Sequence, residues 1–412
     1  MLKLRERKDI SLLVILCSVV YFASYVSRVN LGTVLVEITS SGYASKSVAA
    51  LALSACSVTY GVGQLVSGYL GDKFKPQNII LIGFVVTSLM NLCVGTIGDG
   101  NVLVLLWAVN GFAQAFMWPP LVKILSSLLD DDEYKKACVK VSWGSSLGTI
   151  SMYLLSPLMI ELWSVKAVFV FSGVFAAIVA VVWKLVYDRH KPFNNCIVPK
   201  NNVTSEAADG KKAPSLFTRS SLALLGLIML CILLQGSLRD GVTNWTPTYI
   251  SDIFNLDSSV SILAGVVLPI FSLICFTFVS FINRKFIKNE LLCAGITFGV
   301  GAVSAVLLMV TEGNMVVSLL LLALLVGSMH GVNLILVCVI PAYFTKYGKV
   351  SFISGLINSC TYAGAALSTY GIAVFTDLFG WGKTILLWSV IAFTGGAICL
   401  TLSKKWNKFK AE

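Results

Sequence analysis

Twelve apolar stretches of about 20 residues recur along this chain of 412 residues, and they constrain its fold more than any other feature. A helix of about 20 residues is about 30 Å long, which matches the hydrocarbon core of a bilayer. The chain is 57% hydrophobic and 12% charged, whereas a soluble domain has about 25% charged residues. The sequence therefore predicts an all-α integral membrane protein. Its spans are predicted at roughly 11–37, 48–71, 78–97, 102–127, 137–161, 165–187, 221–250, 260–282, 290–311, 315–341, 350–374 and 383–403.

The basic residues are distributed unevenly along the chain. If the N-terminus is cytoplasmic, only Lys46, Lys166 and Lys383 lie outside, and Arg28 and Arg239 lie within spans. The other 26 of the 31 Lys and Arg residues fall on cytoplasmic loops, tails and helix ends. This asymmetry predicts a multi-pass protein of the inner (plasma) membrane with both termini in the cytoplasm. It also accounts for the net charge of +11 without a nucleic-acid partner.

A polar segment at 188–220, rich in Pro, Asn, Lys and Ser, divides the chain into two parts. Six predicted spans precede it and six follow it. We therefore expect an N-terminal six-helix bundle at 1–187, a cytoplasmic linker at 188–220 and a C-terminal six-helix bundle at 221–412. Such halves are commonly related by a pseudo-symmetry axis along the membrane normal.

The loop between the second and third spans has the sequence Gly68-Tyr69-Leu70-Gly71-Asp72-Lys73. It resembles the signature of the major facilitator superfamily. The resemblance implies a tight turn whose acidic and basic residues hold the ends of neighbouring helices. At the equivalent place in the second half, Asn283 replaces the acid. We expect a weaker latch there.

Arg28 and Arg239 are the two basic residues placed deep within predicted spans. They lie 17 residues beyond Ser11 and 18 beyond Ser221, hence at similar depths of about 26 Å along their helices. A charge at mid-membrane costs at least about 2.5–3.5 kcal/mol, which marks a functional site. The guanidinium fork matches phosphate or carboxylate. Asp240 adjoins Arg239, but neighbours one apart on a helix face different directions, so we expect no pairing between them. The alternative is that each arginine pairs locally for structure.

Other polar and aromatic residues are predicted to line the same cavity. Tyr21 and Tyr25 precede Arg28 by seven and three residues, which places them on its helical face. Each further candidate, taken singly, has a structural interpretation as well as a substrate-binding one. These candidates are Gln64, Trp118, Ser145, His330, Asn358 and Tyr362.

Three segments carry a closer family resemblance. They are Tyr21-x-x-x-Tyr25-x-x-Arg28-x-Asn30, Gly111-Phe112-Ala113-Gln114-Ala115-Phe116-Met117-Trp118-Pro119-Pro120 and Leu238-Arg239-x-Gly241-x-x-x-Trp245-x-Pro247-x-Tyr249. They resemble the organophosphate:phosphate antiporters, which include glycerol-3-phosphate and hexose-phosphate transporters. The resemblance implies that the two arginines bind a phosphoryl group. It also implies that the protein exchanges a phosphorylated metabolite for inorganic phosphate. We expect it to work as a monomer without a cofactor or a metal.

Two positions depart from the glycerol-3-phosphate pattern. Gln64 stands where that pattern has a lysine-bearing helix, and Ser145 stands where it has a histidine. The organic part of the substrate therefore stays open between sugar phosphates, glycerol phosphate and other compounds.

Two other functions stay open as well. Ser27-Arg28-Val29-Asn30-Leu31 resembles helix 1 of the anion:cation symporters, which take up sugar acids with protons. The Arg239 segment favours the antiporters, and no clearly buried carboxylate offers a site for proton coupling. A transporter-like sensor of phosphorylated metabolites is the other alternative. The sequence has no P-loop, no HExxH motif and no Ser/His/Asp arrangement that can be placed on one face, so we do not expect an enzyme.

Overall fold

The computed structural model describes residues 3–96, 100–195, 219–255, 267–311 and 313–411, and these residues form helices joined by short turns, without a strand. They group into two compact units. Unit 1 comprises Met1–Pro214 with Phe344–Ser359, and unit 2 comprises Ser215–Tyr343 with Cys360–Glu412. Most of the predicted linker, residues 196–218, lies outside the described residues.

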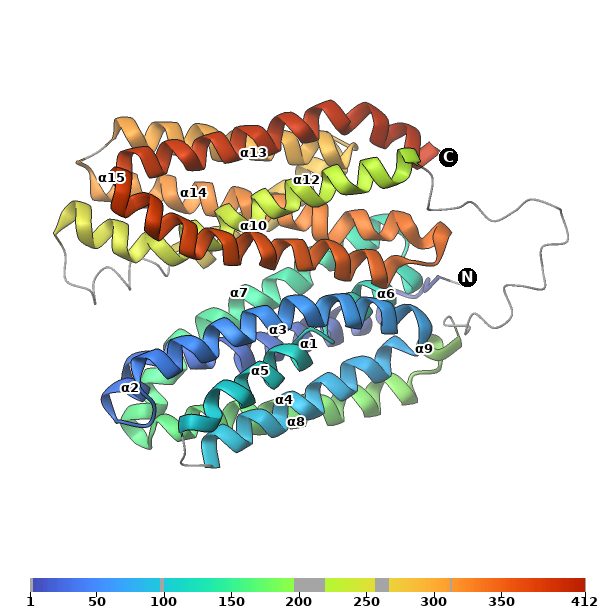
Figure 1. Ribbon diagram of the computed structural model, residues 1–412. Coiled ribbons are helices and arrows are strands. Elements are labelled where there is room, and N and C mark those ends of the chain that lie inside the picture. The colour runs from blue at the N-terminus through green and yellow to red at the C-terminus, as the bar shows by residue number, and fades with distance from the viewer. Residues whose placement is uncertain (1–2, 97–99, 196–218, 256–266, 312, 412) are drawn as a thin grey trace, which may run out of the picture. The chain divides into compact units, whose positions relative to one another are not determined.

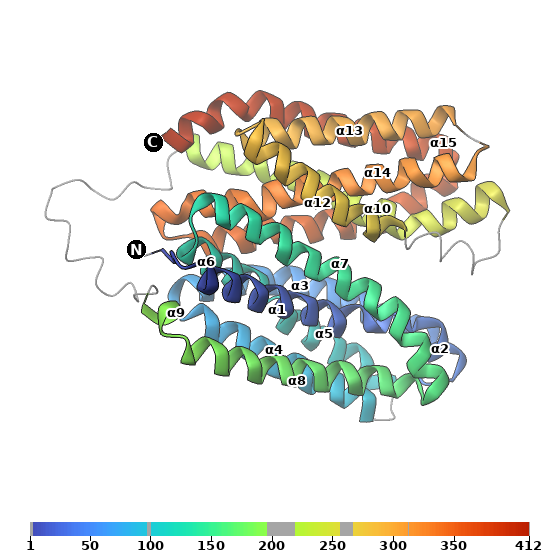
Figure 2. The same ribbon diagram turned by 180° about the vertical axis from the view of Figure 1, so that it is seen from behind.

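Unit 1 is a bundle of long helices. Within it α1 packs on α7, α3 on α5 and α4 on α8, which Figures 1 and 2 show from two sides. Its helices are α1 (Arg7–Thr33), α2 (Leu35–Ser40), α3 (Lys46–Lys73), α4 (Pro76–Thr96), η1 (Gly100–Val102), α5 (Leu103–Gln114), α6 (Trp118–Leu128), α7 (Asp131–Leu162), α8 (Val165–Arg189) and α9 (Lys191–Asn195). The first predicted span was too long at its end, because α1 stops at Thr33 and Val34 leaves the helical conformation.

Unit 2 is built around α14, which packs on α10, α12 and α13. The helix α15 is 62 residues long, and its path bends at Gly380, whose φ of 76° most side chains avoid. The start of the eighth predicted span, at 260–266, lies outside the described residues. The elements of this part of the chain are α10 (Arg219–Phe254), α12 (Val267–Lys285), α13 (Glu290–Val310), α14 (Met315–Asn333), η3 (Leu334–Val339), η4 (Ile340–Tyr347) and α15 (Val350–Ala411). The end of η4 and the start of α15, within Phe344–Ser359, belong to unit 1.

Ten segments in the described part of the chain are long and apolar enough to cross a membrane. Two of them, Val350–Ser368 and Val374–Ala411, are the two parts of α15. The α5–α6 pair and α7 are not among the ten, because the former is interrupted and the apolar part of the latter is rich in serine and glycine. Counting α5–α6 as one path, the helices account for the twelve predicted spans.

The interruption between α5 and α6 follows from two prolines. Pro119 and Pro120 begin α6 directly after Trp118, and neither can donate a backbone N–H to a preceding turn. The chain therefore makes a turn at residues 115–117 and starts a new helix. This break places Trp118 at the N-terminal end of α6.

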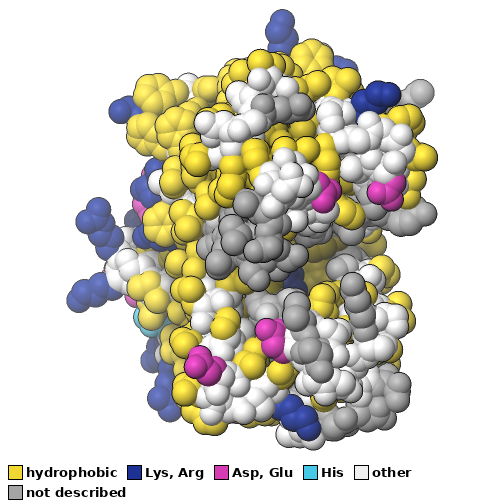
Figure 3. Space-filling model, turned by 90° about the vertical axis from the view of Figure 1, so that its left-hand side faces the viewer, with side chains coloured by type: hydrophobic (Ala, Val, Ile, Leu, Met, Phe, Trp, Pro, Cys, Tyr) yellow, Lys and Arg dark blue, Asp and Glu magenta, His cyan; other side chains and the backbone are white. Residues whose placement is uncertain are grey.

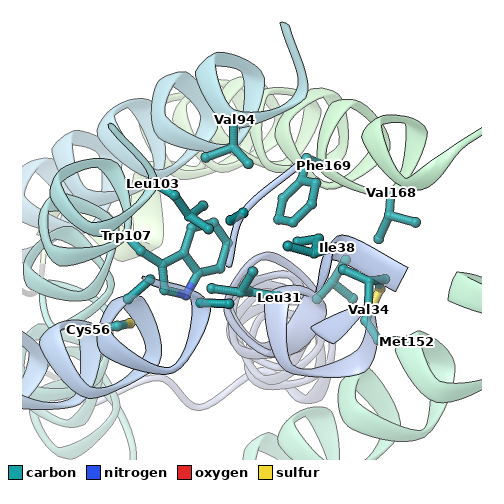
Figure 4. Packing of buried hydrophobic residues seen from close by; sticks show 14 of the residues in the cluster. Leu31, Val34, Ile38, Cys56, Val94, Leu103, Trp107, Met152, Val168 and Phe169 are labelled. Carbon is teal, nitrogen blue, oxygen red and sulfur yellow. The ribbon is translucent and has the colours of Figure 1, made fainter. Parts of the chain in front are cut away.

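The packing of unit 1 is dense at its core and apolar at its surface. Figure 4 shows the cluster that includes Leu31, Trp107 and Phe169, whose side chains are almost fully buried. The rings of Trp107 and Phe169 meet edge to face with centroids 5.7 Å apart. Large hydrophobic side chains also lie on the outside, as Figure 3 shows on one face of the molecule. In a membrane protein these outer side chains meet lipid.

Asp72 lies at the end of α3 and accepts hydrogen bonds from two backbone N–H groups of α15. Its oxygens are 3.1 Å from Ser351 N and 2.9 Å from Phe352 N. The carboxylate thus caps the first turn of α15, where unpaired N–H groups and the helix dipole favour an anion. The predicted role of the acid in holding a neighbouring helix end is confirmed. Lys123 of α6, whose Nζ is 3.6 Å from Oδ1 of Asp72, joins it.

Other details of this segment differ from the prediction. The sequence from Gly68 to Lys73 is still helical, and the turn lies at Phe74 and Lys75. Lys73 hydrogen-bonds to the hydroxyl of Tyr69 in its own helix instead of to a neighbouring one. In unit 2, Asn283 donates to the carbonyl oxygen of Ile287 at 3.0 Å, which is a contact within its own turn.

Candidate functional site

Arg28 projects from α1 against two aromatic rings. Its guanidinium carbon lies 4.2 Å from the ring centroid of Tyr25 and 4.6 Å from that of Tyr60 on α3. Such contacts hold the cation by the ring quadrupole and are strongest where water is excluded. Tyr60 is only 2% exposed. The sequence analysis missed Tyr60, although it stands one turn before Gln64 on the same face of α3.

The aromatic cluster continues from Tyr25 to α6. The ring of Tyr21 lies 5.2 Å from that of Tyr25 and 4.9 Å from that of Trp118, centroid to centroid. Trp118 is 2% exposed, and its indole Nε1 has no acceptor among the described residues. The structure therefore brings three predicted residues, Tyr21, Tyr25 and Trp118, into one cluster with Arg28. Trp118 adds an N–H donor with no protein partner of its own.

A buried amide network fixes the turn of α1 that carries Arg28. The carbonyl oxygen of Ser27 accepts from Nδ2 of Asn91 and from Nδ2 of Asn110, each at 3.1 Å. Asn30 donates to Oδ1 of Asn91 at 2.7 Å. Buried amides are costly unless they are paired, so these bonds fix the rotation of α1 about its axis. Asn30 therefore positions Arg28.

The rotation of α1 about its axis has a second anchor on α5. This anchor comes from the Gly111–Pro120 segment that carries the family resemblance. Ser24 donates to Oε1 of Gln114 at 2.5 Å, and both residues are buried. Gly144 and Gly148 of α7 let the α1 backbone approach on another side. A Cβ atom on either would lie 2.7–2.8 Å from an α1 carbonyl oxygen.

The remaining candidates of unit 1 lie at different places. Gln64 is fully buried, and its Nε2 is 3.4 Å from the carbonyl oxygen of Ala115, while its Oε1 has no hydrogen-bond partner among the described residues. The hydroxyl of Ser145 turns back to the carbonyl oxygen of Ser142 at 2.6 Å. Asn358 is 6% exposed in the first part of α15. Gln64 thus retains an unsatisfied acceptor, and Ser145 is engaged by its own helix.

In unit 2, Arg239 is paired with Asp240, and the expectation that these neighbours face apart was wrong. Nε of Arg239 donates to Oδ1 at 2.6 Å, and Nη2 donates to Oδ2 at 2.8 Å. Successive Cβ atoms diverge by about 100° around a helix. The long arginine stem spans that angle and brings its head beside the carboxylate. The side chains of Arg239 and Asp240 are 12% and 27% exposed, respectively.

The stretch of α10 that carries Arg239 is held by polar contacts to two neighbouring helices. Gln235 is fully buried, donates to the carbonyl oxygen of Met329 at 3.0 Å and accepts from Asn333 at 3.4 Å. Ser237 donates to the carbonyl oxygen of Gly364 on α15 at 3.0 Å. The sequence analysis missed Gln235, whose amide one turn before Arg239 was the available signal.

His330 and Tyr362 are the other predicted residues of unit 2. Both are partly buried. The ring of His330 meets that of Phe276 edge to face with centroids 5.4 Å apart. The charges of Arg239 and Asp240 both act on His330, which places the imidazole in the field of that pair. Tyr362 follows Asn358 by one turn of α15.

Each unit thus carries one of the two predicted site arginines, and the two differ in their electrostatic setting. Arg28 is stacked on aromatic rings, whereas Arg239 is bound side-on by a carboxylate. Around Arg28 lie hydroxyl and indole donors, which suit the oxygens of phosphate, sulfate or carboxylate.

Comparisons with known proteins identify the family. Residues 17–369 match the family model of the Major Facilitator Superfamily. The chain is 24% identical over 421 residues to the glycerol-3-phosphate transporter of Bacillus subtilis (strain 168), covering 95% of this chain and 90% of that one. It is 33% identical over 69 residues to a probable hexose phosphate transport protein of Chlamydia trachomatis serovar D, covering 17% of this chain and only 15% of that one.

A solved structure shares the fold. The proton:xylose symporter XylE, bound to 6-bromo-6-deoxy-D-glucose, superposes with a TM-score of 0.74 at 9% identity, covering 96% of each chain. At that identity the likeness concerns the fold alone. The family match covers most of the twelve-span chain, and the two relatives are named transporters of phosphate esters. The chain belongs to the Major Facilitator Superfamily.

Proposed function

We propose that this membrane transporter exchanges a small phosphorylated metabolite for inorganic phosphate by alternating access. The observation that carries the proposal is Arg28, a cation within a membrane span that stacks on Tyr25 and Tyr60. In this proposal the protein works as a monomer in the plasma membrane, with both termini in the cytoplasm. The family and the named relatives are transporters, and this supports transport over enzymatic activity.

The chemistry of the arginine supports an oxyanion as substrate. A guanidinium stays charged at any physiological pH and offers paired N–H donors. Arginine binds phosphate through its planar guanidinium edge, which donates to a pair of phosphate oxygens. Hydroxyl groups of Tyr21 and Tyr25 and the indole of Trp118 are the further donors that we assign to the anion.

A second candidate function is proton-coupled uptake of an organic anion such as a sugar acid. Two observations in the sequence stood against it, namely the resemblance of the Arg239 segment to the antiporters and the lack of a clearly buried carboxylate. Asp240 supplies a partly buried carboxylate on Arg239, and this observation favours keeping the symporter as an alternative. A phosphometabolite sensor with the same binding site is tested by the same experiment.

Counterflow in proteoliposomes separates these functions. Vesicles with the full-length protein are loaded with labelled phosphate and challenged from outside with phosphate, sugar phosphates, glycerol 3-phosphate and sugar acids. We expect release of label with phosphate and with at least one phosphorylated compound. Exchange with sugar acids alone would overturn the phosphate assignment, and binding without any exchange would indicate a sensor. Uptake that needs an inward proton gradient would favour the symporter.

A further inference from the structure

Asp240 places a negative charge directly on the arginine that is proposed to bind the anion. Both of its oxygens accept hydrogen bonds from the Nε and Nη2 edge of Arg239. This edge is the one that carboxylates and phosphates use for bidentate binding. An anion that reaches Arg239 therefore either binds beside Asp240 or displaces it.

Both routes cost more free energy for a divalent anion than for a monovalent one. If the anion binds beside Asp240, the carboxylate repels each of its charges, and repulsion grows in a medium of low dielectric constant. If the anion displaces Asp240, a carboxylate without its partner remains in the membrane next to a concentrated negative charge. In either case the second charge of the anion is unfavourable.

We propose that Asp240 selects the charge of the transported anion, so that oxyanions with one negative charge bind in preference to those with two. The inference rests on the proposed role of Arg239 in binding the anion. It narrows the substrate class to the monoanions of phosphate and its esters and to monocarboxylates. It also explains how one site serves both of the candidate functions above.

The surroundings of the pair determine how the proposal is tested. From α14, His330 is the titratable group within the field of Arg239 and Asp240. From α15, Thr361 lies against Gly236 of α10 and Ser368 lies against Gly241. Neither side chain changes its charge between acidic and neutral pH. A pH series changes the charge of titratable side chains together with that of the anion, so it would mix two effects. Probes with permanent charges at one pH avoid this problem.

The experiment measures inhibition of labelled phosphate exchange at pH 7.5 by two such probes. Sulfate carries two charges and dimethyl phosphate carries one. For the wild-type protein we expect a lower inhibition constant for dimethyl phosphate than for sulfate. In Asp240→Asn, which keeps the shape of the side chain, the ratio of the sulfate constant to the dimethyl phosphate constant should fall about tenfold. At an effective dielectric constant of about 20, the charge of Asp240 would repel the second charge of sulfate, taken to lie about 10 Å away, by an energy that corresponds to a change of this order in the ratio.

The matched control is Asp252→Asn. Asp252 lies on the same helix as Asp240, 13 residues after Arg239, and it is exposed. Its carboxylate accepts a hydrogen bond from Nε1 of Trp381 at 3.0 Å. It should leave the ratio unchanged. Asp240→Glu, which keeps the charge, should keep most of the preference for dimethyl phosphate.

Two results would overturn charge selection by Asp240. One is a wild-type protein that binds sulfate as tightly as dimethyl phosphate, and the other is an Asp240→Asn variant with an unchanged ratio. Thermal stabilisation of the purified protein by each probe gives the same ratio without transport. If phosphate exchange is absent but this ratio behaves as described, the proposed exchange fails and charge selection stands.

Discussion

The guanidinium of Arg28 lies over the ring of Tyr60, with its central carbon 4.6 Å from the ring centroid. The two residues come from α1 and α3, and Tyr60 is almost fully buried. Tyr25, on the same helix as Arg28, provides the second ring. The two aromatic rings thus orient the cation.

Replacing Tyr60 tests this orientation. Tyr60→Phe keeps the ring, and we expect phosphate affinity close to that of the wild type. Tyr60→Leu removes the cation–π contact, which is worth about 0.5–2 kcal/mol, and should weaken phosphate binding by roughly two- to thirtyfold. Binding is measured by inhibition of labelled phosphate exchange.

A matched control for Tyr60 is available on the same helix. Tyr69 also stacks on a cation, Lys73, but it is 48% exposed. Tyr69→Leu should leave phosphate affinity unchanged. Equal losses in Tyr60→Phe and Tyr60→Leu would show that the hydroxyl group matters and that the ring does not.

Replacing Arg28 or Arg239 with lysine separates geometry from charge. Lysine keeps one positive charge but presents a compact ammonium in place of the planar fork. Loss of one charge-assisted hydrogen bond, worth about 1.5–3 kcal/mol, should weaken binding about ten- to hundredfold. Exchange rates and phosphate affinities are measured with expression level and melting temperature as controls. Wild-type exchange in both variants would remove the arginines from the binding site.

The sequence predicted the helices well because the membrane makes a simple demand on them. About 20 apolar residues are needed for each span, and this signal does not depend on tertiary contacts. Interruptions were harder to predict. The turn between α5 and α6 depends on Pro119 and Pro120, which do not lower the mean hydropathy of the predicted span 102–127 enough to divide it. The bend at Gly380, by contrast, falls between the predicted spans 350–374 and 383–403.

The candidate site was predicted only in part, because helical spacing gives neither the position of the end of a long side chain nor the contacts between helices. Arg28, Tyr21, Tyr25 and Trp118 formed one cluster because helical spacing and the proline break place them there. The pairing of Arg239 with Asp240 was missed, since helical spacing describes Cβ directions and not the end of a long side chain. Tyr60 was missed because contacts between α1 and α3 are tertiary.

Asp72 should stabilise the protein through the helix that it caps. Asp72→Ala removes the acceptor for the backbone N–H groups of Ser351 and Phe352. Loss of a helix cap costs about 0.5–2 kcal/mol, so the melting temperature in detergent should fall by a few degrees. Asp377→Ala, at an exposed position of α15, is the control and should melt like the wild type. Unchanged melting of Asp72→Ala would show that water replaces the cap.

A buried carboxylate at the start of α13 joins it to the C-terminal part of α15. Glu290 is fully buried and accepts from the Tyr343 hydroxyl at 2.6 Å, Nε1 of Trp406 at 2.8 Å and Nζ of Lys410 at 2.8 Å. The lysine is 22% exposed, so much of its charge is still solvated. The carboxylate depends on these donors, because a buried ion without partners is unstable.

Substitutions at both ends of this contact should therefore destabilise unit 2 to different extents. Glu290→Ala leaves three donors without their acceptor and should cost about 3 kcal/mol, whereas Glu290→Gln keeps an acceptor and should cost less. Lys410→Met removes the charge partner and leaves the two neutral donors. Lys404→Met, at an exposed position of the same helix, is the control. Melting temperatures of the single variants and of Glu290→Gln combined with Lys410→Met give the coupling between the two residues. If their effects simply add, the ion pair contributes nothing, and the stability of this contact comes from Tyr343 and Trp406 alone.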